Sequence, residues 1–237
     1  MDLLIEGFQR AFSLILHLDA ELLGIIALSL KISFLALFIG SVLGIPLGAV
    51  MGLRRFPGRG ALISLMNTFM GLPPVVVGLF LYLLLSRSGP LGFMGLLYTP
   101  WAMVTAQTIL AFPIVTALSH SAIVNVDPII RRASMTLGAS PIQVTCTIVN
   151  EARYGILSGV IAALGRVMAE VGAIIIVGGN IAGLTRVMTT AIALETDKGN
   201  FELALALGVI LLALSLLVNV LLHTIQRKGV SHTQTWV

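Results

Sequence analysis

Two groups of polar residues in this apolar chain have types and spacings that could handle an anion. Arg166 and Glu170 stand four positions apart, so on a helix they share one face and can form an ion pair. Arg186, Thr189 and Thr190 follow a glycine-rich run, and guanidinium and hydroxyl groups are donors suited to an oxyanion. Both groups could guide an anion across a membrane. A structural ion pair and a plain polar loop are the alternatives that the sequence leaves open.

Residues for catalysis or metal binding are not grouped in the sequence. The four histidines are scattered, with no two at ligand spacing, and the single cysteine, Cys146, has no neighbouring partner. The chain also lacks the Gly-x-x-x-x-Gly-Lys-Ser/Thr loop that holds nucleotide phosphates. We therefore expect no enzyme, no catalytic residues, no metal and no cofactor bound by this chain.

The composition identifies the elements that must position these residues. The chain is 57% hydrophobic and only 10% charged, whereas soluble domains carry about 25% charged residues. An all-α membrane protein follows, because backbone exposed to lipid must satisfy its own hydrogen bonds. Runs long enough to cross a bilayer cover residues 22–52, 61–85, 97–124, 155–179 and 203–225.

The ends of the chain differ from this five-span core. Residues 1–20 predict an amphipathic helix at the membrane interface, with Leu4, Phe8, Phe12 and Ile15 on one face. Residues 21–226 form the predicted transmembrane domain, and residues 227–237 a short cytoplasmic tail.

Charge predicts the direction of the spans, because loops rich in Lys and Arg stay in the cytoplasm. One side carries eight basic residues and two acids; the other carries four basic residues and seven acids. The basic side would hold Arg54, Arg55, Arg59, Arg131, Arg132, Arg153, Arg227 and Lys228. The N-terminus is then outside, the C-terminus is cytoplasmic, and the loop over 125–154 is cytoplasmic. The basic residues cluster at span ends, so they do not indicate nucleic-acid binding.

The predicted cytoplasmic loop has helix start and stop signals. Asp127 is a natural N-cap and Pro128 a natural first helical residue, so a helix should run to Leu137. Gly138 then suits a left-handed C-terminal cap. A second helix should follow from a Ser-Pro pair over 141–150. Two capped helices favour a docking element over a simple linker.

Several span residues predict close packing or motion. Pro73, Pro74 and Pro113 should each leave a backbone carbonyl unbonded inside a span, which a neighbouring helix or a watery path can satisfy, so they are pore or gate candidates. Gly155 and Gly159 lie one turn apart, a spacing that lets helices approach closely. That contact could lie at the centre of a dimer or within one chain.

At these residues the chain resembles a known family. Residues 132–139, Arg-Ala-Ser-Met-Thr-Leu-Gly-Ala, resemble the Glu-Ala-Ala-x-x-x-Gly-Ala ("EAA") signature of permease subunits of binding-protein-dependent ABC importers, with Arg132 in place of the glutamate. Residues 72–78, 112–115, 165–173 and 178–186 resemble the molybdate/tungstate branch. Residues 150–155 and 186–196 are similar to the tungstate-specific permease.

The resemblance implies a five-span permease of an ATP-driven importer in the inner membrane. Its expected partners are a second copy of the chain, two ATPase subunits that bind ATP and Mg²⁺, and a binding protein that delivers an oxyanion, with tungstate favoured. A permease for molybdate, sulfate or another small solute is the alternative, and a secondary transporter is the second. The residues implied in ATPase coupling are Arg131, Arg132, Ala133, Leu137, Gly138, Ala139 and Ser140.

Overall fold

The computed structural model describes residues 20–230; the predicted interfacial helix, up to residue 19, and residues 231–237 of the predicted tail lie outside the described residues. Within residues 20–230 all regular elements are helices, which confirms the predicted all-α fold. The first six are α2 (Ala20–Leu53), α3 (Arg59–Phe69), α4 (Pro74–Leu85), the short 3₁₀ helix η1 (Gly92–Met94), α5 (Pro100–Val124) and α6 (Pro128–Thr136). The others are α7 (Pro141–Glu151), α8 (Arg153–Met168), α9 (Gly172–Gly178), α10 (Met188–Asp197) and α11 (Phe201–Val230).

The five predicted spans appear as three unbroken helices and two bent pairs. Residues Leu22–Leu53, Pro100–Val124 and Phe201–Val220 are each long and apolar enough to cross a membrane within the described part of the chain. The run 61–85 is instead α3 and α4, bent by 101°, and the run 155–179 is α8 and α9, bent by 58°. Each of these two runs is therefore helical, as expected, but broken into two helices.

The first bend has a simple covalent cause. Pro73 is the N-cap of α4 in an extended conformation, and Pro74 is its first helical residue. Proline has no N–H to donate to the preceding turn, so a pair of prolines ends one helix and starts the next. Pro113, in contrast, lies buried inside the continuous helix α5.

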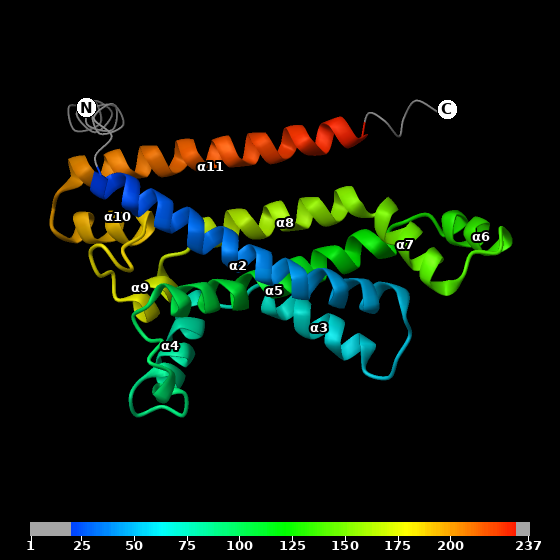
Figure 1. Cartoon of the computed structure of the whole chain (residues 1–237), viewed down its shortest axis with the longest axis horizontal. Coiled ribbons are helices and arrows are strands. Elements are labelled where there is room, and N and C mark those ends of the chain that lie inside the picture. The colour runs from blue at the N-terminus through cyan, green and yellow to red at the C-terminus, as the bar shows by residue number, and fades with distance from the viewer. Residues whose placement is uncertain (1–19, 231–237) are drawn as a thin grey trace.

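Helix α5 is the central helix of the bundle, with α2, α3 and α8 around it (Figure 1). Its most apolar window is 72% buried, against 28% for the corresponding windows of α2 and α11. Glycines at every fourth position of α2 line its contact with α5: Gly40, Gly44, Gly48 and Gly52. A Cβ at Gly48 would lie only 2.7 Å from the Thr116 carbonyl oxygen, so the two backbones approach more closely than any side chain would allow.

The glycines of α8 also face α5 within the same chain. A Cβ on Gly155 would lie 2.7 Å from Cβ of Ala122, and one on Gly159 would lie 2.7 Å from Cβ of Leu118. Between the two alternatives left by the sequence, these two glycines therefore serve packing inside one subunit.

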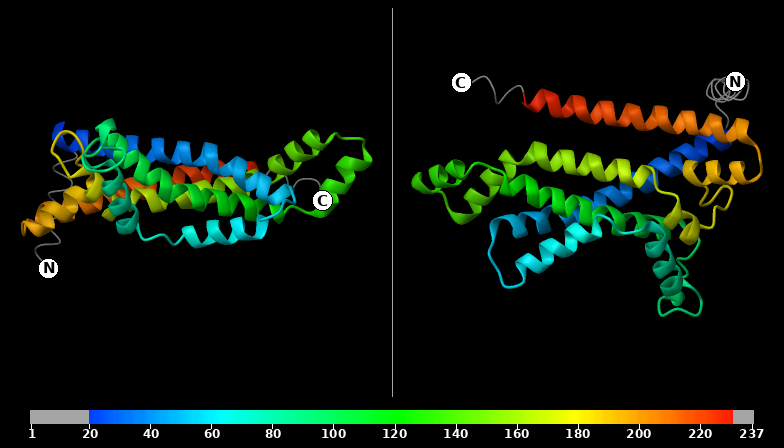
Figure 2. Two further views of the ribbon diagram at one scale, coloured as in Figure 1. Left: turned by 90° about the horizontal axis from the view of Figure 1, so that it is seen from below. Right: turned by 180° about the vertical axis from the view of Figure 1, so that it is seen from behind.

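The two ends of the elongated bundle differ. Helices α6 and α7 extend beyond the other helices at one end, whereas α4, α9 and α10 gather at the other (Figures 1 and 2). Helix α4 leans sideways from the bundle, as its bend relative to α3 requires. Helix α10 contains Thr189 and Thr190, for which the sequence had left a plain polar loop as an alternative.

Candidate functional site

The protruding loop begins with a capped helix, as predicted. The Asp127 carboxylate accepts a hydrogen bond from the backbone N–H of Ile129 at 2.8 Å, and Pro128 is the first residue of α6. This bond satisfies one of the N–H groups that a helix start leaves unpaired. The helix ends at Thr136, one residue before the predicted end.

Gly138 closes α6 in the left-handed conformation that the sequence predicted, with φ +80°. Its N–H donates to the carbonyl of Met135 at 3.0 Å, and the N–H of Ala139 donates to the carbonyl of Ser134 at 3.0 Å. This pair of bonds is the Schellman arrangement, which requires a residue with positive φ after the helix. The turn between α6 and α7 is thereby fixed by backbone bonds.

Helix α7 starts with a reciprocal cap and holds the loop to the bundle. The Ser140 hydroxyl accepts from the N–H of Gln143 at 3.4 Å, and the Gln143 side chain accepts from the N–H of Ser140 at 2.7 Å. Val144 and Ile148 are the buried residues of α7, and they pack with Ile123 of α5 in one cluster. The loop is therefore anchored through α7.

Helix α6, in contrast, has no buried residue. Ile129 is 65% exposed and Leu137 is 88% exposed, although both are large and apolar. The other predicted coupling residues on α6, Arg131, Arg132 and Ala133, are exposed too, while Ala139 packs against the cluster beneath α7. Exposed large apolar side chains on a capped helix are typical of a protein–protein contact.

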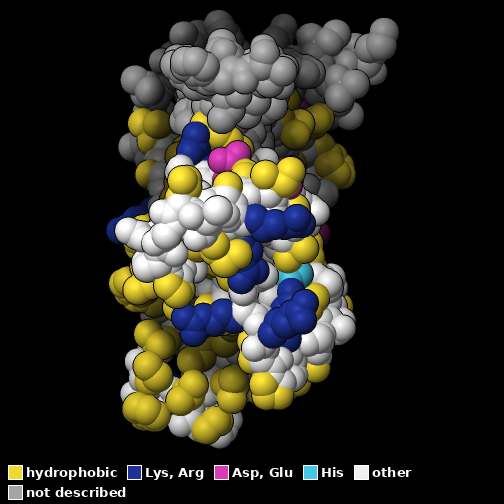
Figure 3. All heavy atoms as spheres, turned by 90° about the vertical axis from the view of Figure 1, so that its right-hand side faces the viewer, with side chains coloured by type: hydrophobic (Ala, Val, Ile, Leu, Met, Phe, Trp, Pro, Cys, Tyr) yellow, Lys and Arg dark blue, Asp and Glu magenta, His cyan; other side chains and the backbone are white. Residues whose placement is uncertain are grey.

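The end of the molecule that carries α6 is basic. Lys and Arg side chains gather on this face, with few acidic side chains among them (Figure 3). Arg54 and Arg55, from the connection between α2 and α3, and Arg59, the first residue of α3, line a cavity of about 430 Å³ together with Arg131 of α6. The structure thus brings together basic residues that are far apart in sequence.

A second polar site lies at the break between α8 and α9. Glu170 is only 3% exposed, and its two carboxylate oxygens have different partners: Oε2 lies 3.2 Å from Nη1 of Arg166, and Oε1 accepts from the N–H of Ala173 at 3.0 Å. The Arg166 side chain is 37% exposed. The predicted ion pair is confirmed, and it joins the last turn of α8 to the first turn of α9.

Side chains from other helices donate hydrogen bonds to backbone carbonyls at the break. The Thr189 hydroxyl donates to the carbonyl of Glu170 at 2.9 Å, and the Gln107 amide donates to the carbonyl of Val167 at 3.2 Å. Both side chains are buried. Gln107 was missed by sequence reasoning, although an amide in the middle of an apolar run was a usable signal, since a buried amide must find partners.

The remaining predicted residues near this site are placed as follows. Thr190 is fully buried, and its hydroxyl exchanges hydrogen bonds with the backbone of Val187 at 3.1 Å. Thr185, which is also fully buried, donates to the carbonyl of Gly178 at 2.6 Å. Arg186, the residue after Thr185, is partly exposed. The structure therefore brings Thr189 to Glu170, while Thr185 and Thr190 hold the backbone between α9 and α10.

Fold and sites together define a multi-pass helical membrane protein with broken spans and a protruding helix–turn–helix at one end. The model of the family described as "Binding-protein-dependent transport system inner membrane component" matches residues 44–229. The chain belongs to this family, the permease subunits of ABC importers.

Individual relatives extend the match over nearly the whole chain. The tungstate uptake system permease protein TupB of Peptoclostridium acidaminophilum is 40% identical over 228 residues, which cover 96% of this chain and 100% of that protein. A probable anion ABC transporter permease protein of Haloferax volcanii is 46% identical over 205 residues, covering 84% and 88%. The fold is similar to that of an inward-facing MetNI methionine ABC transporter chain, with TM-score 0.71 at 19% identity, covering 89% of this chain and 96% of the other.

Proposed function

We propose that this chain is the permease subunit of an ATP-driven importer that carries an oxyanion, with tungstate as the substrate. A binding protein outside the membrane delivers the anion, two copies of the chain form the pathway, and two partner ATPase subunits hydrolyse ATP. Identity of 40% with a tungstate permease across its full length supports this substrate class. The family membership favours ATP-driven import over a secondary transporter.

One observation carries the coupling role: hydrogen bonds fix both ends of α6, yet the large apolar side chains on it and at its C-cap are exposed. The N-cap of Asp127 and the left-handed turn at Gly138 fix its shape, while Leu137 is 88% exposed. Such a helix fits a groove on another protein. We assign that groove to the ATPase subunit, so that movement of the ATPases is transmitted through α7 to α5 and α8.

The basic end of the bundle supports the predicted orientation. Arg54, Arg55, Arg59 and Arg131 line one cavity at the end that carries α6. Positively charged loops stay in the cytoplasm. This end is therefore cytoplasmic in our proposal, and the acidic turn between α10 and α11 lies outside.

The break between α8 and α9 is the proposed place where the anion passes. Arg166 is 37% exposed, so its guanidinium can attract an anion, while Glu170 offsets its charge and prevents tight binding. In this arrangement Thr189 and Thr190 position the backbone, because their hydroxyls already donate to carbonyl oxygens. Arg186 lies on the outer side of this site. The corner at Pro73 and Pro74 and the buried Pro113 remain gate candidates.

The direct test is transport in vesicles that contain this chain, its ATPase and its binding protein. ATP-dependent accumulation of tungstate, with weaker uptake of molybdate and sulfate, is the expected result. A matched preparation with a hydrolysis-deficient ATPase should show no uptake. Preferred uptake of molybdate or sulfate would overturn the substrate assignment, and uptake without ATP would overturn the importer class.

A further inference from the structure

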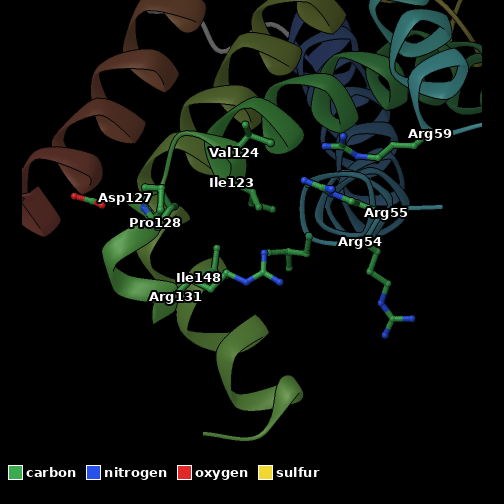
Figure 4. A pocket seen from close by; sticks show the side chains of 12 residues that line it. Arg54, Arg55, Arg59, Ile123, Val124, Asp127, Pro128, Arg131 and Ile148 are labelled. Atoms are coloured by element: carbon green, nitrogen blue, oxygen red, sulfur yellow. The ribbon is translucent and has the colours of Figure 1, made fainter. Parts of the chain in front are cut away.

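The cavity beside α6 is formed by parts of the chain that are distant in sequence. Its volume is about 430 Å³, and it lies between the α2–α3 connection on one side and the start of α6 on the other. Figure 4 shows Arg55 of the α2–α3 connection and Arg59 at the start of α3 reaching toward the side from which Arg131 extends. Three guanidinium groups therefore face a common space.

The charge in this space is not neutralised by the residues that the structure describes. None of the salt bridges recorded over residues 20–230 involves these three arginines, and the Arg59 bond to the Met51 carbonyl, 2.6 Å long, carries no negative charge. Asp127 is the acidic residue on the rim. Its carboxylate accepts from the N–H of Ile129 and points away from the arginines (Figure 4). Like charges held together without a counter-charge favour an anionic ligand.

The apolar part of the wall indicates where this ligand sits. Ile123 and Val124 end helix α5, Leu53 ends helix α2, and Ile148 projects from α7. The cavity thus lies where two spans end, with aliphatic side chains below the guanidinium groups. Basic pockets at the ends of membrane spans suit the phosphate-bearing head groups of lipids.

We propose that this cavity is a binding site for a tetrahedral oxyanion group held by Arg55, Arg59 and Arg131. The group is a phosphate, either on an anionic lipid or free in solution, since arginine forms paired, charge-assisted hydrogen bonds with such oxygens. Bound there, it ties α6 to the α2–α3 connection. It thereby sets how firmly the protruding loop is attached to the bundle.

The test measures binding to the full purified chain and requires no ATPase or transport. The chain is placed in nanodiscs of phosphatidylcholine, and either phosphatidylglycerol or inorganic phosphate is added. Retained lipid is measured by native mass spectrometry, and phosphate binding by titration calorimetry. We expect saturable binding of at least one of the two, weakened about tenfold or more in the double variant Arg55→Gln/Arg131→Gln because two charge-assisted contacts are lost.

The control is Arg153→Gln, which removes the same charge at the same end of the molecule but lies outside the cavity. The affinity of this variant for each probe should stay within about twofold of that of the parent chain, since a distant surface charge is screened by salt. The single variants Arg55→Gln and Arg131→Gln keep the test valid if the double variant does not fold. Each should weaken binding by an intermediate factor.

The outcomes distinguish a lipid head group from free phosphate as the bound group, and both from an acidic surface of a partner protein. Lipid retention without phosphate binding identifies a lipid headgroup, and phosphate binding in phosphatidylcholine alone identifies a free anion; both support the site. No binding of either probe, or equal binding by the double variant, overturns it. A separate pull-down of the ATPase by the same variants tests the rival occupant: loss of ATPase association with unchanged binding of both probes would assign the arginines to an acidic partner surface and would also overturn the site. None of these outcomes decides whether the chain transports tungstate.

Discussion

The guanidinium of Arg166 lies 3.2 Å from the carboxylate of Glu170 across the break between α8 and α9. The same carboxylate accepts the N–H of Ala173 at 3.0 Å, so Glu170 serves both as the counter-ion of Arg166 and as an acceptor for the first turn of α9. One buried side chain thus bridges the two helices of this bent span. Its two roles can be separated by substitution.

Glu170→Ala should destabilise the protein by about 1–3 kcal/mol, because it leaves the Ala173 N–H without its acceptor and Arg166 without its counter-ion. The lower part of this range is expected, because Arg166 is 37% exposed and water can solvate it. Glu170→Gln keeps an acceptor for the Ala173 N–H and should therefore lose less stability than Glu170→Ala. Thermal unfolding in detergent measures both changes. Equal losses for Ala and Gln would show that the hydrogen bond to Ala173 contributes nothing.

Gly138→Val should weaken coupling between ATP hydrolysis and uptake. A β-branched residue at φ +80° costs about 1–2 kcal/mol, so the turn between α6 and α7 should shift. No atoms stand within 4 Å of a Cβ at this position, so the effect is due to backbone conformation and not to a clash. The measurement is the ratio of ATP hydrolysed to anion taken up in vesicles.

Asparagine provides the matched control at this position, because it tolerates the left-handed conformation far better than valine. Gly138→Asn should keep a ratio close to that of the parent chain. Normal coupling in Gly138→Val would count against the role of the turn. Equal loss of coupling in Gly138→Val and Gly138→Asn would show that no side chain is tolerated at this position, whatever its backbone preference.

Gly48→Val should destabilise the bundle through its contact with α5. The new Cβ would meet the Thr116 carbonyl oxygen at 2.7 Å and the Ser119 Cβ at 2.9 Å, and overpacking of this kind costs about 1–3 kcal/mol. Gly24→Val on the same helix is the control, because nothing lies within 4 Å of a Cβ there. The melting temperature should fall for Gly48→Val only. Similar melting temperatures for both variants would contradict the close approach of α2 and α5.

Acid should loosen the turn between α10 and α11. Lys198 hydrogen-bonds the Glu195 carboxylate at 2.8 Å and lowers the pKa of that carboxyl, with further lowering from Asn200 and Arg186. Because the folded-state pKa is depressed, the stabilisation is present above the unfolded-state pKa and is lost as pH falls through the folded-state value. Proteolysis of this turn should therefore rise on acidification. The rate at which the Glu195→Gln variant is cleaved should not rise on acidification, because its amide does not titrate. A rise as large as that of the parent chain would refute the assignment to Glu195.

The capped loop was predictable from sequence because its signals are local. Asp127, Gly138 and Ser140 each act on backbone groups within three residues, so each cap can be read without knowing the fold. The apolar runs were predictable for a similar reason. Length and composition decide which segments enter a membrane, whatever packs against them.

The bends and the partners of small residues depend on the tertiary structure, so they were harder to predict. Residues 169–171 contain no proline, and the break there is stabilised by Glu170, Thr189 and Gln107, which lie on separate segments. The glycines of α2 recur at every fourth position, a visible signal that the sequence reasoning missed. For Gly155 and Gly159 the spacing was recognised, but spacing alone does not name the helix that fills the gap.

The central claim, that α6 docks on a partner ATPase, is tested most directly by cross-linking at Leu137. Cys146 is the single cysteine, so Cys146→Ser gives a background in which Leu137→Cys is the one reactive thiol. Leu212→Cys, on α11 and 72% exposed, is the matched control. A thiol cross-linker should join Leu137→Cys to the ATPase in intact membranes and leave Leu212→Cys unlinked. No cross-link from Leu137→Cys in an assembly that still transports would contradict the account.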